Sequence, residues 1–193
     1  MATPKLQSGV AEALRTLSVA RRSAAKARTQ AINQLRSLLI SAPDDLRERL
    51  WKTKPEQCVA GCARLRNVEG NVLLKTLTVT LRLLAKRWLM LSAELKDLDA
   101  KLDRLTSQSA KRLRNQFGVG PQTAAILIAV AGDNPERLRN EAALAALCGA
   151  SPLQASSGKT ARHRLNRGGD RSANNALWTI AMVRMRSEPR TQA

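Results

Sequence analysis

Apolar and small residues recur every three or four positions along the first forty residues of the chain. Such steps place the side chains on one face of an α-helix, so we predict a helix over residues 10–40. Prolines with acidic neighbours at Pro43 and Pro55 are typical of the first turns of two further short helices. The stripe of the first helix comprises Val10, Leu14, Leu17, Ala20, Ala24, Ala27, Ala31, Leu35 and Leu38.

A heptad pattern between residues 71 and 106 is the clearest periodic signal in the chain. Its members are Leu77, Leu81, Leu84, Trp88, Leu91, Leu95, Leu98, Leu102 and Leu105. Alternating steps of four and three predict one long helix with a coiled-coil seam. The seam needs a partner, which is either the helix over residues 10–40 folded back or the same helix of a second chain. The pattern leaves both open, and we expect a homo-oligomer through the coiled coil.

A helix, a glycine turn and a second helix are predicted after residue 110. The turn contains Gly118 and Gly120, and the second helix ends at Gly132. This order is typical of a helix-hairpin-helix, in which turn amides and a helix N-terminus hold a DNA phosphate. We therefore name Gly118, Gly120 and Thr123 as candidate phosphate contacts; the alternative is an ordinary tight turn. A helix from Asn134 to about Leu147 and a last helix capped by Asp170 follow.

The predicted fold is mainly α, with two parts. Residues 1–110 form a helical region whose long helices build a coiled-coil arm. Residues 111–193 form a small helical domain with the helix-hairpin-helix, a basic loop or short hairpin, and the terminal helix.

Charge narrows the class of partner. Lysine and arginine number 33 against 15 acidic residues, a formal net charge of +18. Such a field favours polyanions, and nucleic acid before an anionic membrane. No apolar run reaches the about 18 residues of a membrane-spanning helix, so we expect DNA and no membrane as partner, in a cytoplasmic, nucleoid-associated protein. We interpret Cys58, Cys62 and Cys148 as small buried residues rather than zinc ligands.

Positive charge is densest just before the last helix. Its cations are Lys159, Arg162, Arg164, Arg167 and Arg171. They are suited to phosphate oxygens, whether the segment is an extended loop or a short hairpin. Ser157, followed by Gly158, presents a hydroxyl in a turn. A serine nucleophile needs a base or metal to take its proton and cations to stabilise the phosphate charge; only the second requirement is clearly met. The alternative is a plain Ser-Gly turn.

Three stretches in this order resemble the C-terminal transposase domain of the insertion-sequence 110 family: GVGPQTAAILIAVAGD, LAALCGASPLQASSGKT and RHRLNRGGDRSANNALW. The earlier stretch VARRSAAKARTQAINQLRSLLISAPDDLRERL looks like the helical region that these proteins place before it. The resemblance implies a serine that attacks the scissile DNA phosphate and forms a phosphoserine intermediate. The matching residue is Ser157, with Ser156 as its rival. It also implies a guide RNA encoded by the element, and backbone contacts by the five cations named above.

The family's enzymes also carry an N-terminal RNase H-like domain whose acidic tetrad binds magnesium. That tetrad has no counterpart in this sequence, so we expect no cofactor in this chain, and Mg²⁺ only together with the missing acidic domain. The chain looks like a truncated transposase or half of an interrupted gene, which binds nucleic acid but does not cleave DNA by itself. The alternative is a non-catalytic nucleic-acid-binding protein with a helix-hairpin-helix and a coiled coil. A coiled-coil interaction protein whose charge only aids solubility is a third class.

Overall fold

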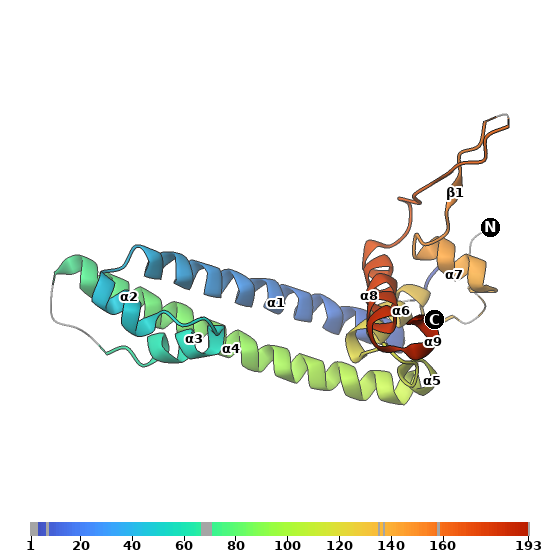
Figure 1. The fold of residues 1–193 in the computed structure, drawn as a ribbon. Helices are drawn as coiled ribbons and strands as arrows, with labels where there is room; N and C mark the ends of the chain where they lie inside the picture. The colour runs from blue at the N-terminus through green and yellow to red at the C-terminus, as the bar shows by residue number, and fades with distance from the viewer. Residues whose placement is uncertain are drawn as a thin grey trace. The chain divides into compact units, whose positions relative to one another are not determined.

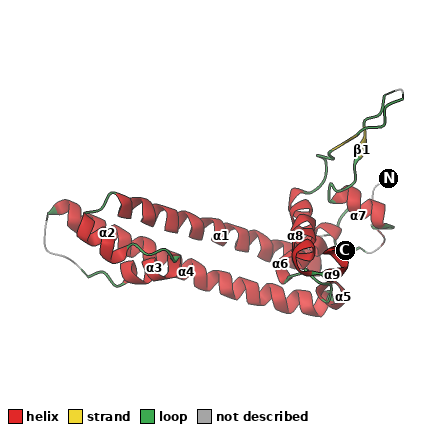
Figure 2. Ribbon diagram, in the orientation of Figure 1, coloured by secondary structure: helices red, strands yellow, loops and turns green. Residues whose placement is uncertain are grey.

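The computed structural model describes residues 4–6, 8–66, 71–134, 136, 138–157 and 159–192. The fold is mainly α, as predicted (Figure 2). The chain forms two compact units, one of Ala20–Leu98 and one of Met1–Val19 with Asp99–Ala193. The elements, labelled in Figure 1, are α1 (Val10–Ile40), α2 (Asp44–Leu50), α3 (Pro55–Ala63), α4 (Val72–Ser109), α5 (Lys111–Arg114), α6 (Pro121–Ala131), α7 (Glu141–Leu147), β1 (Leu153–Gln154), β2 (His163–Arg164), α8 (Arg171–Ser187) and α9 (Pro189–Gln192).

The first four helices follow the predicted pattern closely. Helix α1 has the predicted bounds, and α4 continues to Ser109, three residues beyond the predicted end. Pro55 lies in the first turn of α3, and Asp44 and Asp45 lie in the first turn of α2. Proline fits there because its missing N–H has no partner to lose, and acids favour the positive end of a helix.

Within the unit Ala20–Leu98, the leucine seam of α4 is covered by helices of the same chain. Leu81, Ala85 and Trp88 of α4 belong to one apolar cluster, and Leu77 and Leu84 pack against it. The rest of the cluster comes from the preceding helices and includes Ala31, Ile32, Leu35 and Leu39 of α1, Leu46 and Leu50 of α2, and Cys58, Val59 and Cys62 of α3. Of the two seam partners that the sequence left open, the folded-back α1 thus covers the seam from Leu77 to Trp88, together with α2 and α3.

The last two residues of the seam, Leu102 and Leu105, lie in the second unit. Leu102 is fully buried beside Leu14 of α1 and Ala125 of α6, with Leu105 packed against them. The seam therefore contributes to a separate small core there, and α6 completes it.

All three cysteines are buried, and their thiols are free. Burial raises the pKa of Cys62 to about 12, with a smaller contribution from Cys58 beside it. A thiol with so high a pKa stays protonated and unreactive at neutral pH. They fill space in the cores as small apolar residues, in agreement with the interpretation above.

Helix α7 begins later than the sequence predicted. It starts at Glu141, where the Asn140 side chain accepts a hydrogen bond from the amide of Ala143 at 2.9 Å. The predicted cap, Asn134, is instead buried, and its amide nitrogen donates to the carbonyl of Pro4 at 3.0 Å. The Asn134 side chain therefore binds the N-terminal segment and does not cap α7. Pro135 lies outside the described residues.

None of the described helices has the length and the apolar character needed to cross a bilayer.

The buried seam can be tested against an exposed leucine of the same helix. Leu81 is fully buried and Leu83, two residues on, is 61% exposed. We expect Leu81→Ala to lower the free energy of unfolding by about 2–5 kcal/mol, because it leaves a cavity. Leu83→Ala should change it by no more than about 0.5 kcal/mol. Urea denaturation followed by circular dichroism measures both; equal effects would show that the seam is not packed as described.

Candidate nucleic-acid interface

The glycine turn before α6 is fixed to helix α8. Gly118 has a φ of +80°, a conformation that glycine adopts without strain. A Cβ at this position would lie 3.3 Å from the carbonyl oxygen of Ile180 on α8. The Arg184 guanidinium of the same helix donates to the carbonyl of Phe117 at 3.0 Å. Gly118 is therefore required for the tight turn and its close approach to α8.

Gly120 and Thr123 lie at the start of α6, in a more open part of the turn. Gly120 caps the helix, and no described atom lies within 4 Å of the position that its Cβ would occupy. The Thr123 hydroxyl donates to the carbonyl of Gly120 at 3.0 Å, so it serves the first helical turn. The N-terminus of α6 is thus accessible at Gly120, while Thr123 has a local structural role.

The basic segment between α7 and α8 forms a short β-hairpin. Strands β1 and β2 pair antiparallel, with Leu153 opposite Arg164. The amide of Ala155 donates to the carbonyl of Arg162 at 2.8 Å. Ser157 and Thr160 exchange both backbone hydrogen bonds at 3.2 Å. Of the two forms that the sequence left open, the structure has the hairpin; Gly158 lies outside the described residues.

The register of the hairpin separates the two candidate serines. Directly opposite residues on paired strands point to the same face, and alternate residues point to opposite faces. Ser157 therefore shares a face with Arg162 and Arg164, and Ser156 shares the other with His163. The Ser156 hydroxyl also accepts the amide of Arg162 at 3.4 Å. All five side chains are exposed. Of the two serines, Ser157 is the one that lies on the same face as Arg162 and Arg164.

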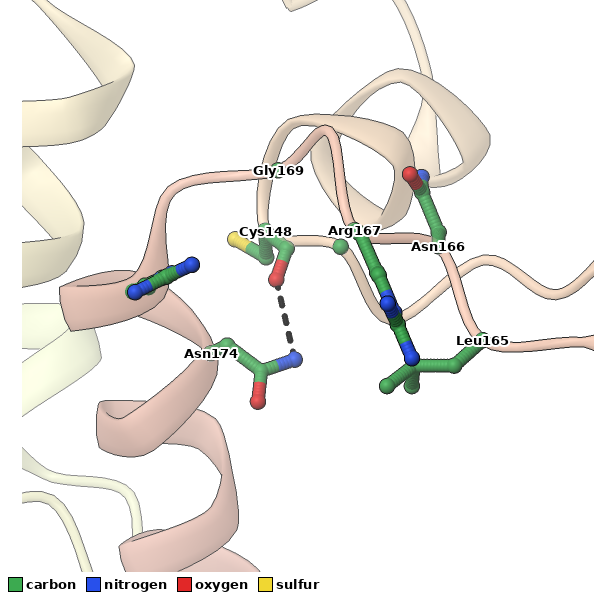
Figure 3. Close-up of a pocket in the computed structure, with 8 residues that line it drawn as sticks. Cys148, Leu165, Asn166, Arg167, Gly169 and Asn174 are labelled. Atoms are coloured by element: carbon green, nitrogen blue, oxygen red, sulfur yellow. Dashed lines mark hydrogen bonds between the residues drawn. The ribbon is translucent and has the colours of Figure 1, made fainter.

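The two ends of the hairpin segment are held together by close backbone packing. A Cβ at Gly169 would overlap the backbone of Gly149. The amide of Asp170 donates to the carbonyl of Leu147 at 2.8 Å, and the side-chain amide of Asn174 donates to the carbonyl of Cys148 at 3.1 Å (Figure 3). These contacts attach the C-terminal end of α7 to the N-terminal end of α8. The hairpin extends from this base (Figure 1).

A cavity of about 340 Å³ lies at this base. Arg167 and Leu165 line it (Figure 3). Arg171, a second of the predicted cations, lines it as well. Asn166 and Asn174 line it too, and the charge pattern had given no signal for these neutral side chains. Lys159, Arg162 and Arg164 belong to the exposed hairpin. The five predicted cations therefore occupy one continuous segment, two at the base and three along the hairpin.

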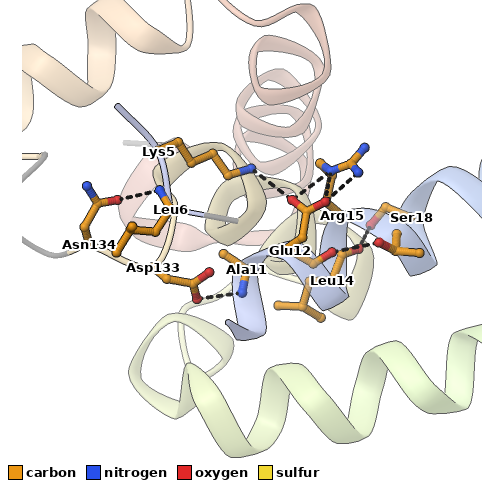
Figure 4. A network of polar contacts seen from close by, with 10 residues as sticks. Lys5, Leu6, Ala11, Glu12, Leu14, Arg15, Ser18, Asp133 and Asn134 are labelled. Carbon is orange, nitrogen blue, oxygen red and sulfur yellow. Dashed lines mark hydrogen bonds and ion pairs between the residues drawn. The ribbon is translucent and has the colours of Figure 1, made fainter. Parts of the chain in front are cut away.

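Several carboxylates of the described residues are held in contacts that do not suit a magnesium ion. Asp133 accepts the amide of Ala11 at the start of α1, at 2.8 Å, and Glu12 pairs with Arg15 and Lys5 (Figure 4). The hydrogen bond from Arg15 lowers the pKa of Glu12.

The remaining paired carboxylates show the same pattern. Asp44 pairs with Arg47, Asp103 with Arg114 and Glu188 with Arg184. Asp170 caps α8 through the amides of Ser172 and Ala173. Among the described residues, no three histidine, cysteine or acidic side chains cluster as metal ligands would. The donors among the described residues therefore do not fit Mg²⁺.

Residues 110–193 match the family model described as "Transposase IS116/IS110/IS902 family". This part of the chain is similar to the C-terminal part of the transposases of that family. The match covers a little under half of the chain, and it includes the glycine turn, the hairpin, the cavity and α8. It agrees with the resemblance seen in the sequence. Comparison with curated proteins finds no match.

The packing at the base of the hairpin can be tested with two adjacent glycines. Gly169→Ala should destabilise the domain by about 1–3 kcal/mol, because the added methyl group overlaps backbone that cannot rotate away. Gly168→Ala is the matched control, since its Cβ would meet only a side-chain oxygen of Asn166 at 3.4 Å. We expect a lower melting temperature for Gly169→Ala alone. Equal melting temperatures for both variants would contradict the close packing.

Proposed function

We propose that the transposase domain acts in DNA transposition, by binding the DNA backbone through the hairpin and the glycine turn. Five cations of one segment support this proposal, since none of them forms an ion pair within the described part of the chain. Unpaired arginines are suited to phosphate oxygens, which they bind through charge-assisted hydrogen bonds. Such contacts do not depend on base sequence. The open N-terminus of α6 at Gly120 offers a further backbone contact.

Ser157 is the nucleophile in this proposal, and Ser156 is its rival. The observation that supports Ser157 is its place: an exposed residue on the hairpin face that carries Arg162 and Arg164. In the proposed step a bond forms between Ser157 Oγ and phosphorus. The bond from phosphorus to the departing deoxyribose oxygen breaks, that oxygen takes up a proton, and the serine proton passes to a base. The arginines stabilise the negative charge that develops on the phosphate.

The base and the magnesium come from elsewhere in this proposal. His163 lies on the opposite face of the hairpin from Ser157, and the carboxylates near the domain serve arginines and helix ends. We therefore propose that this chain binds nucleic acid by itself and cleaves DNA only together with the acidic domain that the resemblance implies. The element's guide RNA is a second polyanion that the same cations would suit.

Self-association is a further part of the proposal. The seam of α4 is already used within the chain, but other apolar side chains of α4 are exposed. Leu73, Leu83 and Met90 are between 61% and 73% exposed. A second copy could bury this area.

A non-catalytic nucleic-acid-binding module is the alternative function. It is favoured by one observation, namely that Ser157 is exposed on a hairpin whose histidine, His163, lies on the opposite face. In that case the cations bind nucleic acid and the serine has no chemical role. The two functions share the salt dependence below and differ in the adduct test after it.

Nucleic-acid binding should weaken steeply with salt. Each phosphate contact releases counterions, so the affinity for duplex DNA should fall by orders of magnitude between about 50 and 200 mM salt. The double variant Arg162→Ala, Arg164→Ala should reduce the slope of log affinity against log salt by about 2. Arg49→Ala, an exposed arginine of the other unit, is the control. Fluorescence anisotropy measures the slopes. An affinity that does not change with salt would contradict phosphate binding and indicate that the positive charge only aids solubility.

The nucleophile can be identified by a covalent adduct. We mix the full chain with the acidic domain, the guide RNA, magnesium and element-end DNA, and look for a protein–DNA adduct that survives denaturation. Wild type and Ser156→Ala should form it. Ser157→Ala should lose it while binding DNA as wild type does, because only the attacking oxygen is removed.

Three results would contradict parts of this proposal. An adduct in Ser157→Ala excludes that residue, and loss of the adduct in Ser156→Ala alone favours the rival. Strand cleavage by the chain without the acidic domain would contradict the need for that partner.

A further inference from the structure

One face of α8 is exposed although it carries large apolar side chains. Trp178 is 61% exposed and Met185 is 60% exposed. The opposite face holds Ala173 and Ala176, which are buried. Exposed aromatic side chains of this size are typical of binding surfaces rather than of a solvated helix face. Trp178 is not part of that buried face, so packing within the described residues does not account for its position.

The exposed face of α8 continues into the cavity at the base of the hairpin. Arg171 and Asn174 line that cavity, and Trp178 lies one helical turn beyond Asn174. Residues at positions i and i+4 are neighbours on a helix surface. At 1.5 Å per residue, Arg171 and Trp178 are about 10 Å apart along the axis. That length is about three stacked nucleotides at 3.4 Å each.

The cavity has the chemistry of a nucleotide site rather than of a site for phosphate alone. Arg167 and Arg171 provide positive charge, Asn174 provides an amide whose nitrogen is bound to Cys148, and Leu165, 71% exposed, provides an apolar wall. The volume of about 340 Å³ falls within the range of small-ligand pockets. Cations suit the phosphates of a strand, and apolar and aromatic surfaces suit its bases.

We propose that the cavity at the base of the hairpin and the exposed face of α8 bind unpaired nucleotides of a DNA strand, with a base stacked on Trp178. This inference rests on the proposed function, because it assumes that the transposase domain binds DNA. It adds that the bound strand is unpaired and that the protein contacts its bases. A paired duplex cannot offer the face of a base to Trp178, since its bases are stacked on one another. Arg167 and Arg171 hold the phosphates on either side, and Asn174 faces the base edge.

The test compares three DNA probes with the full chain. They are a single-stranded oligonucleotide, the same strand with abasic sites, and the matching duplex. Base–aromatic stacking raises the affinity for a strand with bases, and abasic DNA has no base that could stack. Trp178→Ala should therefore weaken binding of the single strand on the order of tenfold, and leave binding of the abasic strand and of the duplex unchanged. Trp178→Phe should retain most of the affinity, because phenylalanine also stacks.

The controls separate stacking from folding and from charge. The salt slope of Trp178→Ala should equal that of wild type, since the phosphate contacts remain. Trp51→Ala removes a tryptophan that is 40% exposed in the other unit, and it should bind all three probes as wild type does. A melting temperature equal to that of wild type excludes a folding defect in Trp178→Ala.

The outcomes distinguish the inference from the proposed function. If wild type binds DNA with a steep salt dependence but Trp178→Ala binds the single strand within about twofold of it, the inference is wrong and the proposed function stands. An equal loss on the abasic strand would likewise overturn the stacking role. Absence of salt-dependent DNA binding by wild type would overturn the proposed function, and this inference with it.

Discussion

The contact of Gly169 with the backbone of Gly149 is the constraint on which the rest of the candidate site depends. It brings together the two ends of a long segment between α7 and α8, and the hydrogen bonds of Asp170 and Asn174 strengthen the closure. Connections of this length that contain little regular structure are uncommon unless they have a function. The strands between these ends pair in one register, with Leu153 opposite Arg164 and Ser157 opposite Thr160. That register decides which serine shares a face with the arginines.

The distribution of charge in the second unit follows from the same arrangement. Several described carboxylates lie at helix ends or pair with arginines, as with Asp133 at α1, Asp170 at α8 and Asp103 with Arg114. The cations of the hairpin segment are left to solvent. An array of like charges without counter-charges repels itself and attracts polyanions. This repulsion disfavours the hairpin of the free protein, and under the proposed function a bound phosphate backbone would relieve it.

Much of the helical architecture could be predicted from the sequence, because periodicity alone determines which faces of a helix must be buried. The bounds of α1 and the seam of α4 follow from that pattern. The partner of the seam could not be predicted in this way, since a leucine stripe fits any apolar surface. The predicted start of α7 was wrong because the Asn134 side chain donates a hydrogen bond to Pro4. Pro4 lies far away in the sequence, and no local pattern can show such a contact. In the site, charge identified the cations, whereas the hairpin register, the cavity and Trp178 depend on the tertiary structure.

Hydrogen exchange of the full chain with and without DNA tests the central claim most directly, because it locates the contact without any substitution. The account predicts that DNA slows exchange in residues 153–186, over the hairpin and α8, while the amides of Ala20–Leu98 exchange at the same rate in both states. Slower exchange only within Ala20–Leu98, with the hairpin unaffected by saturating DNA, would contradict it.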